Sequence, residues 1–466
     1  MKDCIGKIKD TPIVALFFPK LYPEQKVQEG KKVFIPLSIL TVGSYVMGKG
    51  ISVLLIDSRV EKEDEYKENL LSLKDRLLCV GVSVLTNQIP DGVNFSRFIK
   101  EKLPEVPVIW GGWHATIFHE ETIKSPYVDI IVKGEGEYIF SDLLSHLLGK
   151  KSLDNILGIN YKLNGEIKIN PPMPVGQSFP TNKLYYEELL DLSLYEVMKG
   201  EIGYRSSRGC PHRCAYCLIQ HTFHRRWIGK PANEVVEDII YLKERFNIHH
   251  VKFLDDNFFT ERERVKKICE GFIAHKVDIT WEVNGHVNTL NRTDFETFKL
   301  IKKAGCIKLT TGVESGSTKM LTLLQKDIKI ETVIPLAKRI REAEIPFRTN
   351  FIVGLPKESK EDLLKTFKII QELYKINLDQ LVAIYLYSPI PGTILYEWEI
   401  KHGEKIHYPS SIEEWANYKF DKVGEIDASK PWTREAHLMS LEGYRDRRYI
   451  KLMTFYLWIC CLNPKV

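Results

Sequence analysis

The residues best suited to chemistry are three cysteines in one short segment, Cys210-Pro-His-Arg-Cys214-Ala-Tyr-Cys217. Thiolates bind soft metals, and three of them cannot saturate the irons of a four-iron cluster. One iron would keep an open coordination position, which a catalytic cluster needs and an electron carrier does not. The spacing therefore predicts a 4Fe-4S cluster bound by Cys210, Cys214 and Cys217.

A zinc site is the alternative, because zinc accepts both sulfur and nitrogen ligands in a tetrahedral arrangement. Zinc-binding cysteines usually come as repeated C-x-x-C pairs, whereas the other nearby candidates here are histidines. The possible fourth ligands are His212, His221 and His224. The pattern favours iron and sulfur over zinc.

The composition of the chain indicates several domains in a reducing compartment. A length of 466 residues suggests two or three domains. The formal net charge of +5 gives no indication of a nucleic-acid partner. Nine cysteines, an odd number with three of them clustered, indicate metal binding rather than disulfides. The N-terminal residues do not resemble a secretory signal, so we expect a cytoplasmic protein.

Apolar runs and amphipathic stretches alternate over the first 170 residues, which predicts an α/β domain with a doubly wound parallel sheet. The expected strands are 13–18, 53–56, 78–84, 106–110 and 129–132. Such sheets bind ligands beyond the carboxyl ends of their strands. The loops there carry Ser83, Thr86, Gly111, Gly112, His114, Gly134, Glu135 and Gly136. Glycines would let a bulky cofactor approach the backbone, although tight turns, with His114 capping one of them, would give the same pattern.

A second series of strands and helices follows a hairpin at 158–169 and a proline-rich segment at 171–174. Its strands are expected near 204, 251–254, 279–283, 307–311, 348–353 and 381–387. Six such units predict a partial (βα)6 barrel, open on one side. The expected domains are 10–150 (parallel sheet), 151–200 (hairpin and linker), 201–395 (barrel) and 396–466 (a mainly helical cap).

The cysteine segment, on the first loop of a six-strand barrel, resembles the radical S-adenosylmethionine (SAM) superfamily. Later segments resemble it as well, across about 204–393: Phe253–Phe258, Gly312–Gly316, Phe351–Pro356 and Ser388–Thr393. The resemblance implies that the reduced cluster splits SAM into methionine and a 5′-deoxyadenosyl radical, which takes hydrogen from an unactivated carbon. An electron donor such as flavodoxin or ferredoxin is implied with it.

The same resemblance implies a set of SAM-binding residues, while it names no catalytic side chain. The set comprises Tyr216, Ile352 and Gly354 at the adenine, Asp255 and Asp256 at the methionine amino group, and Glu314 and Ser315 at the ribose or carboxylate. On their own, Asp255 and Asp256 are also found as helix caps, and Ile352 is typical of barrel core.

The combination of an N-terminal sheet with this barrel resembles the cobalamin-binding subclass of the superfamily. Gly111–His114 and Lys133–Glu137 are similar to its loops, and the subclass usually lacks an Asp-x-His-x-x-Gly signature, as this chain does. The resemblance implies a Rossmann-like cobalamin domain and transfer of a methyl group from cobalamin to a substrate carbon. Ring formation or rearrangement without methyl transfer is the alternative within the subclass.

Two other classes are less consistent with the sequence. Methylthiotransferases also join an α/β domain to this barrel, but they need three further cysteines, and the first domain has only Cys4 and Cys79. A non-catalytic cobalamin or metal sensor would be expected to carry a DNA-binding or signalling segment, and none is evident.

The last 70 residues carry the fewest signals. Trp415 and Trp432 suggest a packed cap over the open barrel edge. The uncharged run 452–464, which contains Cys460 and Cys461, is too short to span a bilayer. It would either dock on the barrel as a helix or lie at a membrane surface, which would suit a lipid rather than another small-molecule substrate.

Overall fold

The computed structural model describes residues 11–21, 33–176, 179–180, 183–376, 381–402 and 409–417. These residues form two compact units. One comprises the described residues up to Ile202 together with 409–417, and the other runs from Gly203 to the described residues before 403. Trp432, the run 452–464, and Cys4, Cys460 and Cys461 lie outside the described residues.

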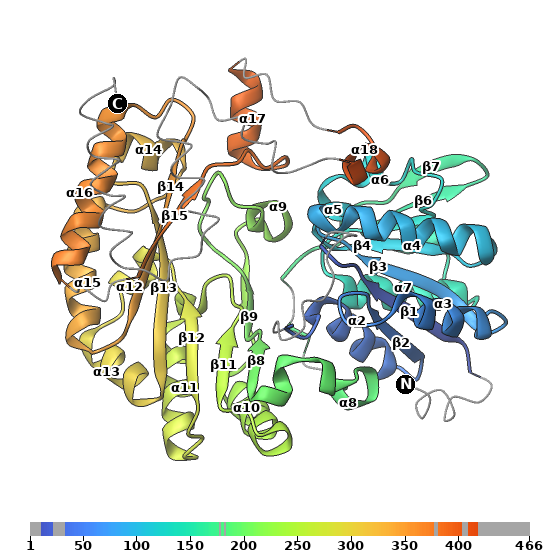
Figure 1. Cartoon of the computed structure of the whole chain (residues 1–466), viewed down its shortest axis with the longest axis horizontal. Coiled ribbons are helices and arrows are strands. Elements are labelled where there is room, and N and C mark those ends of the chain that lie inside the picture. The colour runs from blue at the N-terminus through green and yellow to red at the C-terminus, as the bar shows by residue number, and fades with distance from the viewer. Residues whose placement is uncertain are drawn as a thin grey trace. The chain divides into compact units, whose positions relative to one another are not determined.

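The first unit is built on a seven-stranded sheet with the order β2-β1-β3-β4-β5-β6-β7 (Figure 1). Its strands are β1 (Ile13–Phe18), β2 (Ser52–Asp57), β3 (Leu77–Ser83), β4 (Val108–Gly111), β5 (Ile130–Val132), β6 (Ile159–Leu163) and β7 (Glu166–Ile169). Strands β1 to β5 pair in parallel, as the sequence predicts. The predicted hairpin, β6 and β7, pairs antiparallel to β5 and extends this sheet instead of forming a separate linker.

Helices cover this sheet because its central strands are apolar on both faces. Residues 13–17 of β1 are all at most 3% exposed. The helices are α2 (Leu37–Met47), α3 (Glu63–Ser72), α4 (Ile89–Lys102), α5 (Gly112–Ile117), α6 (His119–Thr122), α7 (Gly136–Leu147), α8 (Tyr186–Leu189) and α18 (Ile412–Asn417). Trp110 in β4 is fully buried, and its indole N–H donates to Ser96 Oγ of α4 (2.8 Å).

The helix α18 corrects one prediction from the sequence. Trp415 was expected in a cap over the barrel, but Ile412 and Trp415 belong to the buried core of the first unit. Local sequence patterns could not reveal this, because the helix packs against α4, which lies about 300 residues earlier in the chain.

The second unit contains a six-stranded sheet with the order β15-β14-β13-β12-β11-β8. Its strands are β8 (Glu201–Tyr204), β11 (His250–Phe253), β12 (Thr280–Asn284), β13 (Cys306–Glu314), β14 (Phe347–Val353) and β15 (Leu381–Leu386). The pairs from β11 to β15 are parallel, and β8 and β15 lie at opposite edges of the sheet. This is the predicted open six-strand barrel.

Helices follow the strands of this sheet, and those of nine or more residues lie along its outer side (Figure 1). They are α10 (Ala232–Phe246), α11 (Arg262–Ala274), α12 (Val287–Asn291), α13 (Phe295–Lys303), α14 (Thr318–Leu323), α15 (Val333–Glu342), α16 (Lys360–Ile376) and α17 (Ile394–Lys401). The buried rings of Phe253, Phe258 and Trp281 pack against one another. The indole N–H of Trp281 donates to the Ala304 carbonyl at the end of α13 (2.8 Å), so these rings lie between the sheet and its helices. In the described parts of the chain, every helix is too short or too polar to span a bilayer.

Candidate active site

A small β-ribbon closes the base of the cysteine segment. Strands β9 (Ser207–Gly209) and β10 (Trp227–Gly229) pair antiparallel, with the three cysteines and α9 (Ile219–Phe223) in the loop between them. Gly209, which precedes Cys210, has φ +79°, and a Cβ there would lie 2.2 Å from the Arg226 carbonyl oxygen. Only glycine fits where the two strands come this close.

The cysteine loop is also bound to the barrel by backbone hydrogen bonds. The Ala215 N–H donates to the carbonyl of Leu324 at the end of α14 (2.7 Å), and the N–H of Leu395 in α17 donates to the Ala215 carbonyl (2.8 Å). Ala215 is buried with Leu324, Leu395 and other apolar residues, against which Tyr216 and Ile352 pack. Ile352 therefore lies in an apolar cluster beside the cysteine loop, a suitable surface for a planar base.

The three thiols are free and largely removed from solvent, and Cys214 is 7% exposed. Burial raises the pKa of Cys210 to about 12 and that of Cys217 to about 11, while the Lys326 cation opposes both shifts. Metal binding requires deprotonated thiols, so a nearby cation favours it. Three thiolates from one loop, beside a buried cation, fit a 4Fe-4S cluster.

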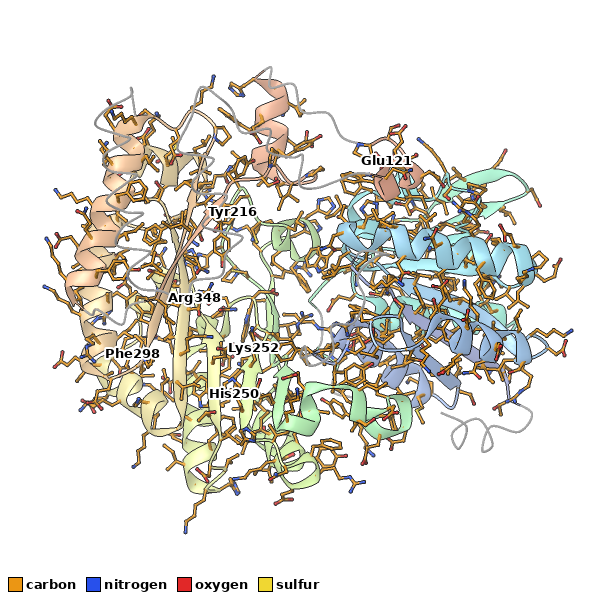
Figure 2. The ribbon with its side chains drawn as sticks, viewed as in Figure 1. Glu121, Tyr216, His250, Lys252, Phe298 and Arg348 are labelled. Carbon is orange, nitrogen blue, oxygen red and sulfur yellow. The ribbon has the colours of Figure 1, made fainter. Side chains whose placement is uncertain are left out.

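A buried polar group contacts this loop. The Tyr216 hydroxyl donates to Glu314 Oε1 (2.7 Å), and Lys326 Nζ lies 3.2 Å from the same oxygen and 3.3 Å from the Tyr216 oxygen. Burial lowers the pKa of Lys326, but Glu314 and the neighbouring thiols outweigh burial and raise that pKa overall. Figure 2 shows Tyr216 toward the end of the sheet where β14 and β15 finish, away from His250 at the start of β11.

No sequence pattern marks Lys326 as a site residue. It follows α14 by three positions, in no motif, and only the fold shows that its ammonium group reaches Glu314 and the thiols. A buried ammonium group beside a SAM-binding cluster is chemically suited to a carboxylate such as that of methionine.

Asp255 is hydrogen-bonded within the protein. It is 1% exposed and accepts hydrogen bonds from the Ser206 N–H (3.1 Å), the Ser206 hydroxyl (2.8 Å) and the Ser207 hydroxyl. Arg264 donates to the Ser206 carbonyl (2.7 Å) and interacts electrostatically with Asp255. Asp255 therefore supports the strand that enters the cysteine loop. It does not cap a helix, and α11 begins later, at Arg262.

Asp256 has a related position, because its Oδ2 accepts the N–H of Gly209 (2.8 Å), the residue before Cys210. Burial raises the pKa of Asp256, and Arg205 opposes that shift. Asp255 thus contacts the start of β9, and Asp256 contacts its end.

Ser315 and Gly354 are each bonded within the protein. Ser315 is fully buried, with its hydroxyl 3.1 Å from Thr366 Oγ1, so it lies behind Glu314 rather than at a ligand-accessible surface. Gly354 has φ +76°, and its N–H donates to Glu358 Oε2 (2.7 Å).

Two histidines stack beside the cysteine loop. The rings of His212 and His286 are 3.4 Å apart at 13°. The Nδ1 of His286 accepts the Asn288 N–H (3.2 Å), so its neutral ring carries the proton on Nε2, which is buried without a partner, as is Nε2 of His212. Within the described residues, no three His, Cys, Asp or Glu side chains converge as a single zinc ion would require.

Among the loops predicted to bind cobalamin in the first unit, Gly134 is open. It has φ +87°, and nothing lies within 4 Å of where a Cβ would be. Gly112 also has φ +87°, but a Cβ there would lie 2.8 Å from the backbone N and O of Val84. Gly112 is therefore required for packing between two loops, while Gly134 leaves space that a large cofactor could enter, which fits cobalamin.

The other predicted residues of these loops have mixed surroundings. Ser83 Oγ donates to Ser38 (3.1 Å), and Glu135 accepts the Gly176 N–H (3.1 Å). A Cβ on Gly136 would lie 3.2 Å from Val42, and one on Gly111 would meet only ordinary contacts. His114 is completely buried, and its Nδ1 lies 3.3 Å from Thr86 Oγ1. The side chain therefore connects α5 to the segment that follows β3.

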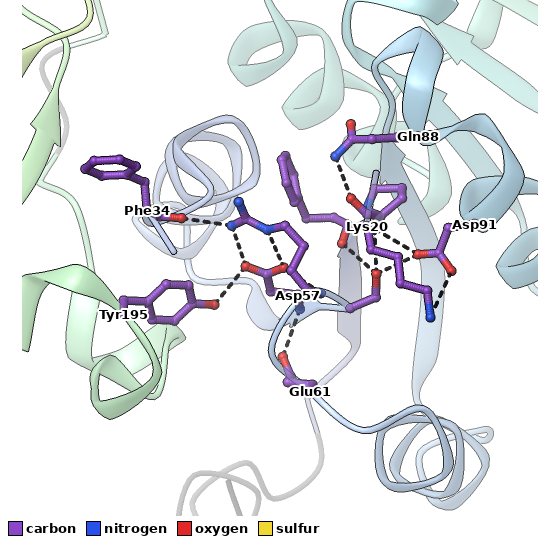
Figure 3. Close-up of polar contacts among 11 residues, drawn as sticks. Lys20, Phe34, Asp57, Glu61, Gln88, Asp91 and Tyr195 are labelled. Carbon is purple, nitrogen blue, oxygen red and sulfur yellow. Dashed lines mark hydrogen bonds and ion pairs between the residues drawn. The ribbon is translucent and has the colours of Figure 1, made fainter. Parts of the chain in front are cut away.

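The carboxyl ends of β1 and β2 are occupied by a separate polar network (Figure 3). Asp57 binds Arg59 (2.6 Å) and accepts from the Tyr195 hydroxyl (3.0 Å). Asp91 accepts from the Ser58 hydroxyl (2.6 Å) and from the Lys20 N–H (3.0 Å). Because these groups satisfy one another, the open glycine at the β5 loop is the more suitable place for a cofactor.

Comparison with known protein families identifies two domains in this chain. Residues 204–370 match the radical SAM superfamily, and residues 27–144 match the B12 binding domain. A protein of Pyrococcus horikoshii named as an uncharacterized methyltransferase is 30% identical over 326 residues, which is 70% of each chain. The anaerobic magnesium-protoporphyrin IX monomethyl ester cyclase of Synechocystis is 25% identical over 410 residues, 84% of this chain and 80% of the relative.

Solved structures show the same fold. The radical SAM methyltransferase TsrM of Kitasatospora setae, with a SAM analog and tryptophan, has a TM-score of 0.71 at 17% identity, covering 86% of this chain and 78% of that one. Another TsrM structure contains cobalamin and a 4Fe-4S cluster. The chain belongs to the cobalamin-binding subclass of the radical SAM superfamily, and its cofactors are a 4Fe-4S cluster, SAM and cobalamin.

Proposed function

We propose that this radical SAM enzyme is a C-methyltransferase, which methylates an unactivated carbon of a small-molecule or lipid biosynthetic intermediate. When bound, the cluster would supply the electron that cleaves SAM, and cobalamin would supply the methyl group. The observation that carries the proposal is the presence of both sites in one chain: the cysteine loop with its buried Lys326, and the open Gly134 loop.

In this proposal, the protein holds SAM rather than reacting with it. Cys210, Cys214 and Cys217 would hold the cluster, and Lys326 would bind the methionine carboxylate in exchange for part of its contact with Glu314. Tyr216 and Ile352 would contact the adenine from the apolar cluster around Ala215. Asp255 and Asp256 would position the loop that carries the first cysteine.

The names of relatives support methyl transfer, since the Pyrococcus relative is named a methyltransferase and TsrM is titled as one. A cyclase is the second candidate, because the Synechocystis relative that covers 84% of this chain is named a cyclase. We further propose that the enzyme works in the reducing cytoplasm, with a flavodoxin or ferredoxin as electron donor. The free cysteines at the site are consistent with such a compartment.

In the test, the reconstituted enzyme is incubated without oxygen with hydroxocobalamin, a reductant and SAM whose methyl group is deuterated. Extracts that contain candidate substrates are added. A methyltransferase forms S-adenosylhomocysteine and 5′-deoxyadenosine together and gives a product heavier by the labelled methyl group. A cyclase forms 5′-deoxyadenosine and an unlabelled product without matching S-adenosylhomocysteine. The second result would replace the methyltransferase proposal by the cyclase one.

A further inference from the structure

The helix α18 is part of the cobalamin-binding unit, although it follows the barrel in the chain. Its residues Ile412 and Trp415 are 0% and 1% exposed and belong to the core formed with α4, β3 and β4. Ser411 precedes the helix, and its Oγ accepts the Glu414 N–H (3.2 Å). This segment is therefore an integral element of the fold of the first unit.

Trp415 contacts α5, the short helix that follows β4. Its ring lies 5.6 Å from that of His114 at 80°, an edge-to-face arrangement, and 5.3 Å from that of Phe118. His114 comes two residues after Gly112, at the carboxyl end of the parallel sheet. The indole thus lies directly behind one of the loops assigned to cobalamin.

His114 connects this loop to its neighbour. Its N–H donates to the Val84 carbonyl (3.1 Å), and its Nδ1 lies 3.3 Å from Thr86 Oγ1, so both contacts reach the loop after β3. The imidazole is fully buried between this loop and the indole. Removing the indole would leave a void on the side of the ring that faces α18, and His114 could then turn away from Thr86.

A hydrogen bond fixes the helix beside these rings. The Ser125 hydroxyl, which follows α6, donates to Glu413 Oε1 (2.7 Å). Together with the buried Ile412 side chain, this bond sets the rotation of α18, so Trp415 points at His114. The contact between Trp415 and His114 is therefore maintained by a hydrogen bond and by apolar packing of α18.

We propose that Trp415 is a positioning residue for cobalamin: through His114, it holds the loops after β3 and β4 in the shape that receives the cofactor. The affinity for cobalamin then depends on a segment that lies beyond the barrel in the chain. The inference rests on the proposed function, in which cobalamin binds at the open Gly134 loop after β5. This loop contacts α5, because the Gly134 N–H donates to Thr116 Oγ1 (3.0 Å).

The test measures equilibrium binding of hydroxocobalamin to the full chain carrying its cluster. Trp415→Ala should weaken binding about tenfold or more, as loss of supporting contacts does at other cofactor sites. Trp415→Phe, which keeps an aromatic edge against His114, should restore most of the affinity. Asn417→Ala, on the exposed side of the same helix, is the matched control and should bind like the wild type.

Two further measurements separate positioning from general stability and from the location of the cofactor. Amide hydrogen exchange at residues 111–118 should rise in Trp415→Ala while the iron content of the protein stays constant. Gly134→Asn, which places a tolerated side chain in the open space, should abolish binding if cobalamin lies there.

The outcomes are distinct. If Gly134→Asn loses cobalamin and Trp415→Ala binds it normally, the positioning proposal is wrong and the proposed function is untouched. If neither variant changes binding, the proposed location of cobalamin is wrong and the positioning proposal falls with it. If Trp415→Ala does not fold, Trp415→Leu decides, because it fills the core without an aromatic ring, and normal binding by it overturns the proposal.

Discussion

Replacing Asp255 distinguishes a residue that supports the cysteine loop from one that binds SAM. Asp255→Ala leaves the Ser206 N–H and the hydroxyls of Ser206 and Ser207 without their buried acceptor. It also removes the carboxyl group that faces Arg264, a side chain that is 5% exposed. A buried donor without a partner costs about 1–3 kcal/mol, and breaking a buried charged contact costs about 3–5 kcal/mol.

Because these contributions overlap, we expect the free energy of unfolding of the barrel unit to fall by about 3–5 kcal/mol. For a unit of this size, the melting temperature would fall by about 6–20 °C. The assay is calorimetry, which measures thermal unfolding of the cluster-free protein in the absence of SAM. Glu270→Ala, an exposed position on α11, is the matched control and should unfold within about 0.5 kcal/mol of the wild type.

A residue that binds SAM would behave differently. Its replacement by alanine would leave the stability of the SAM-free protein unchanged and would raise only the KM for SAM. If Asp255→Ala unfolds like the wild type and binds SAM weakly, the supporting role is refuted and Asp255 belongs to the SAM site.

Other predictions follow from the same geometry. Burial lowers the pKa of His114 to about 3, below its unfolded value of 6.5, so its stabilising contribution is complete above pH 6.5 and is lost as the pH falls toward 3. Between pH 6.5 and 5, the wild type should lose about 2 kcal/mol relative to His114→Asn, measured by urea unfolding; equal losses would contradict the buried neutral ring. Lys326→Met should raise the KM for SAM about tenfold or more while cobalamin still binds, and an unchanged KM would remove Lys326 from the site. Gly112→Ala should destabilise the first unit more than Gly134→Ala, by about 1–3 kcal/mol in thermal unfolding, because only the first Cβ meets the Val84 backbone; equal effects would show that the loops are not packed as described.

The sequence alone predicted the elements whose pattern is local. The strand 13–18 follows from continuous apolar residues, and the structure has it at Ile13–Phe18. The six barrel strands were found in the same way. The cysteine spacing indicated the cluster because three thiols in a fixed spacing have few other uses.

Features that depend on distant contacts could not be predicted. The strands β9 and β10 have three residues each, too few to show alternation. Lys326 approaches Glu314 only through the turn after α14, and Trp415 packs on helices that precede it by hundreds of residues. The sequence shows that Asp255 follows a barrel strand, but only the fold shows that the serines at 206 and 207 surround its carboxyl group.

Anaerobic formation of 5′-deoxyadenosine from SAM and a reductant tests whether Cys210, Cys214 and Cys217 hold a catalytic 4Fe-4S cluster. The wild type and Cys214→Ala would be compared after reconstitution with iron and sulfide. We expect 5′-deoxyadenosine and bound iron for the wild type, and neither for the variant, because the two remaining thiolates cannot retain the cluster. Zinc in the purified wild type, with no 5′-deoxyadenosine after reconstitution, would show that the three cysteines bind zinc instead.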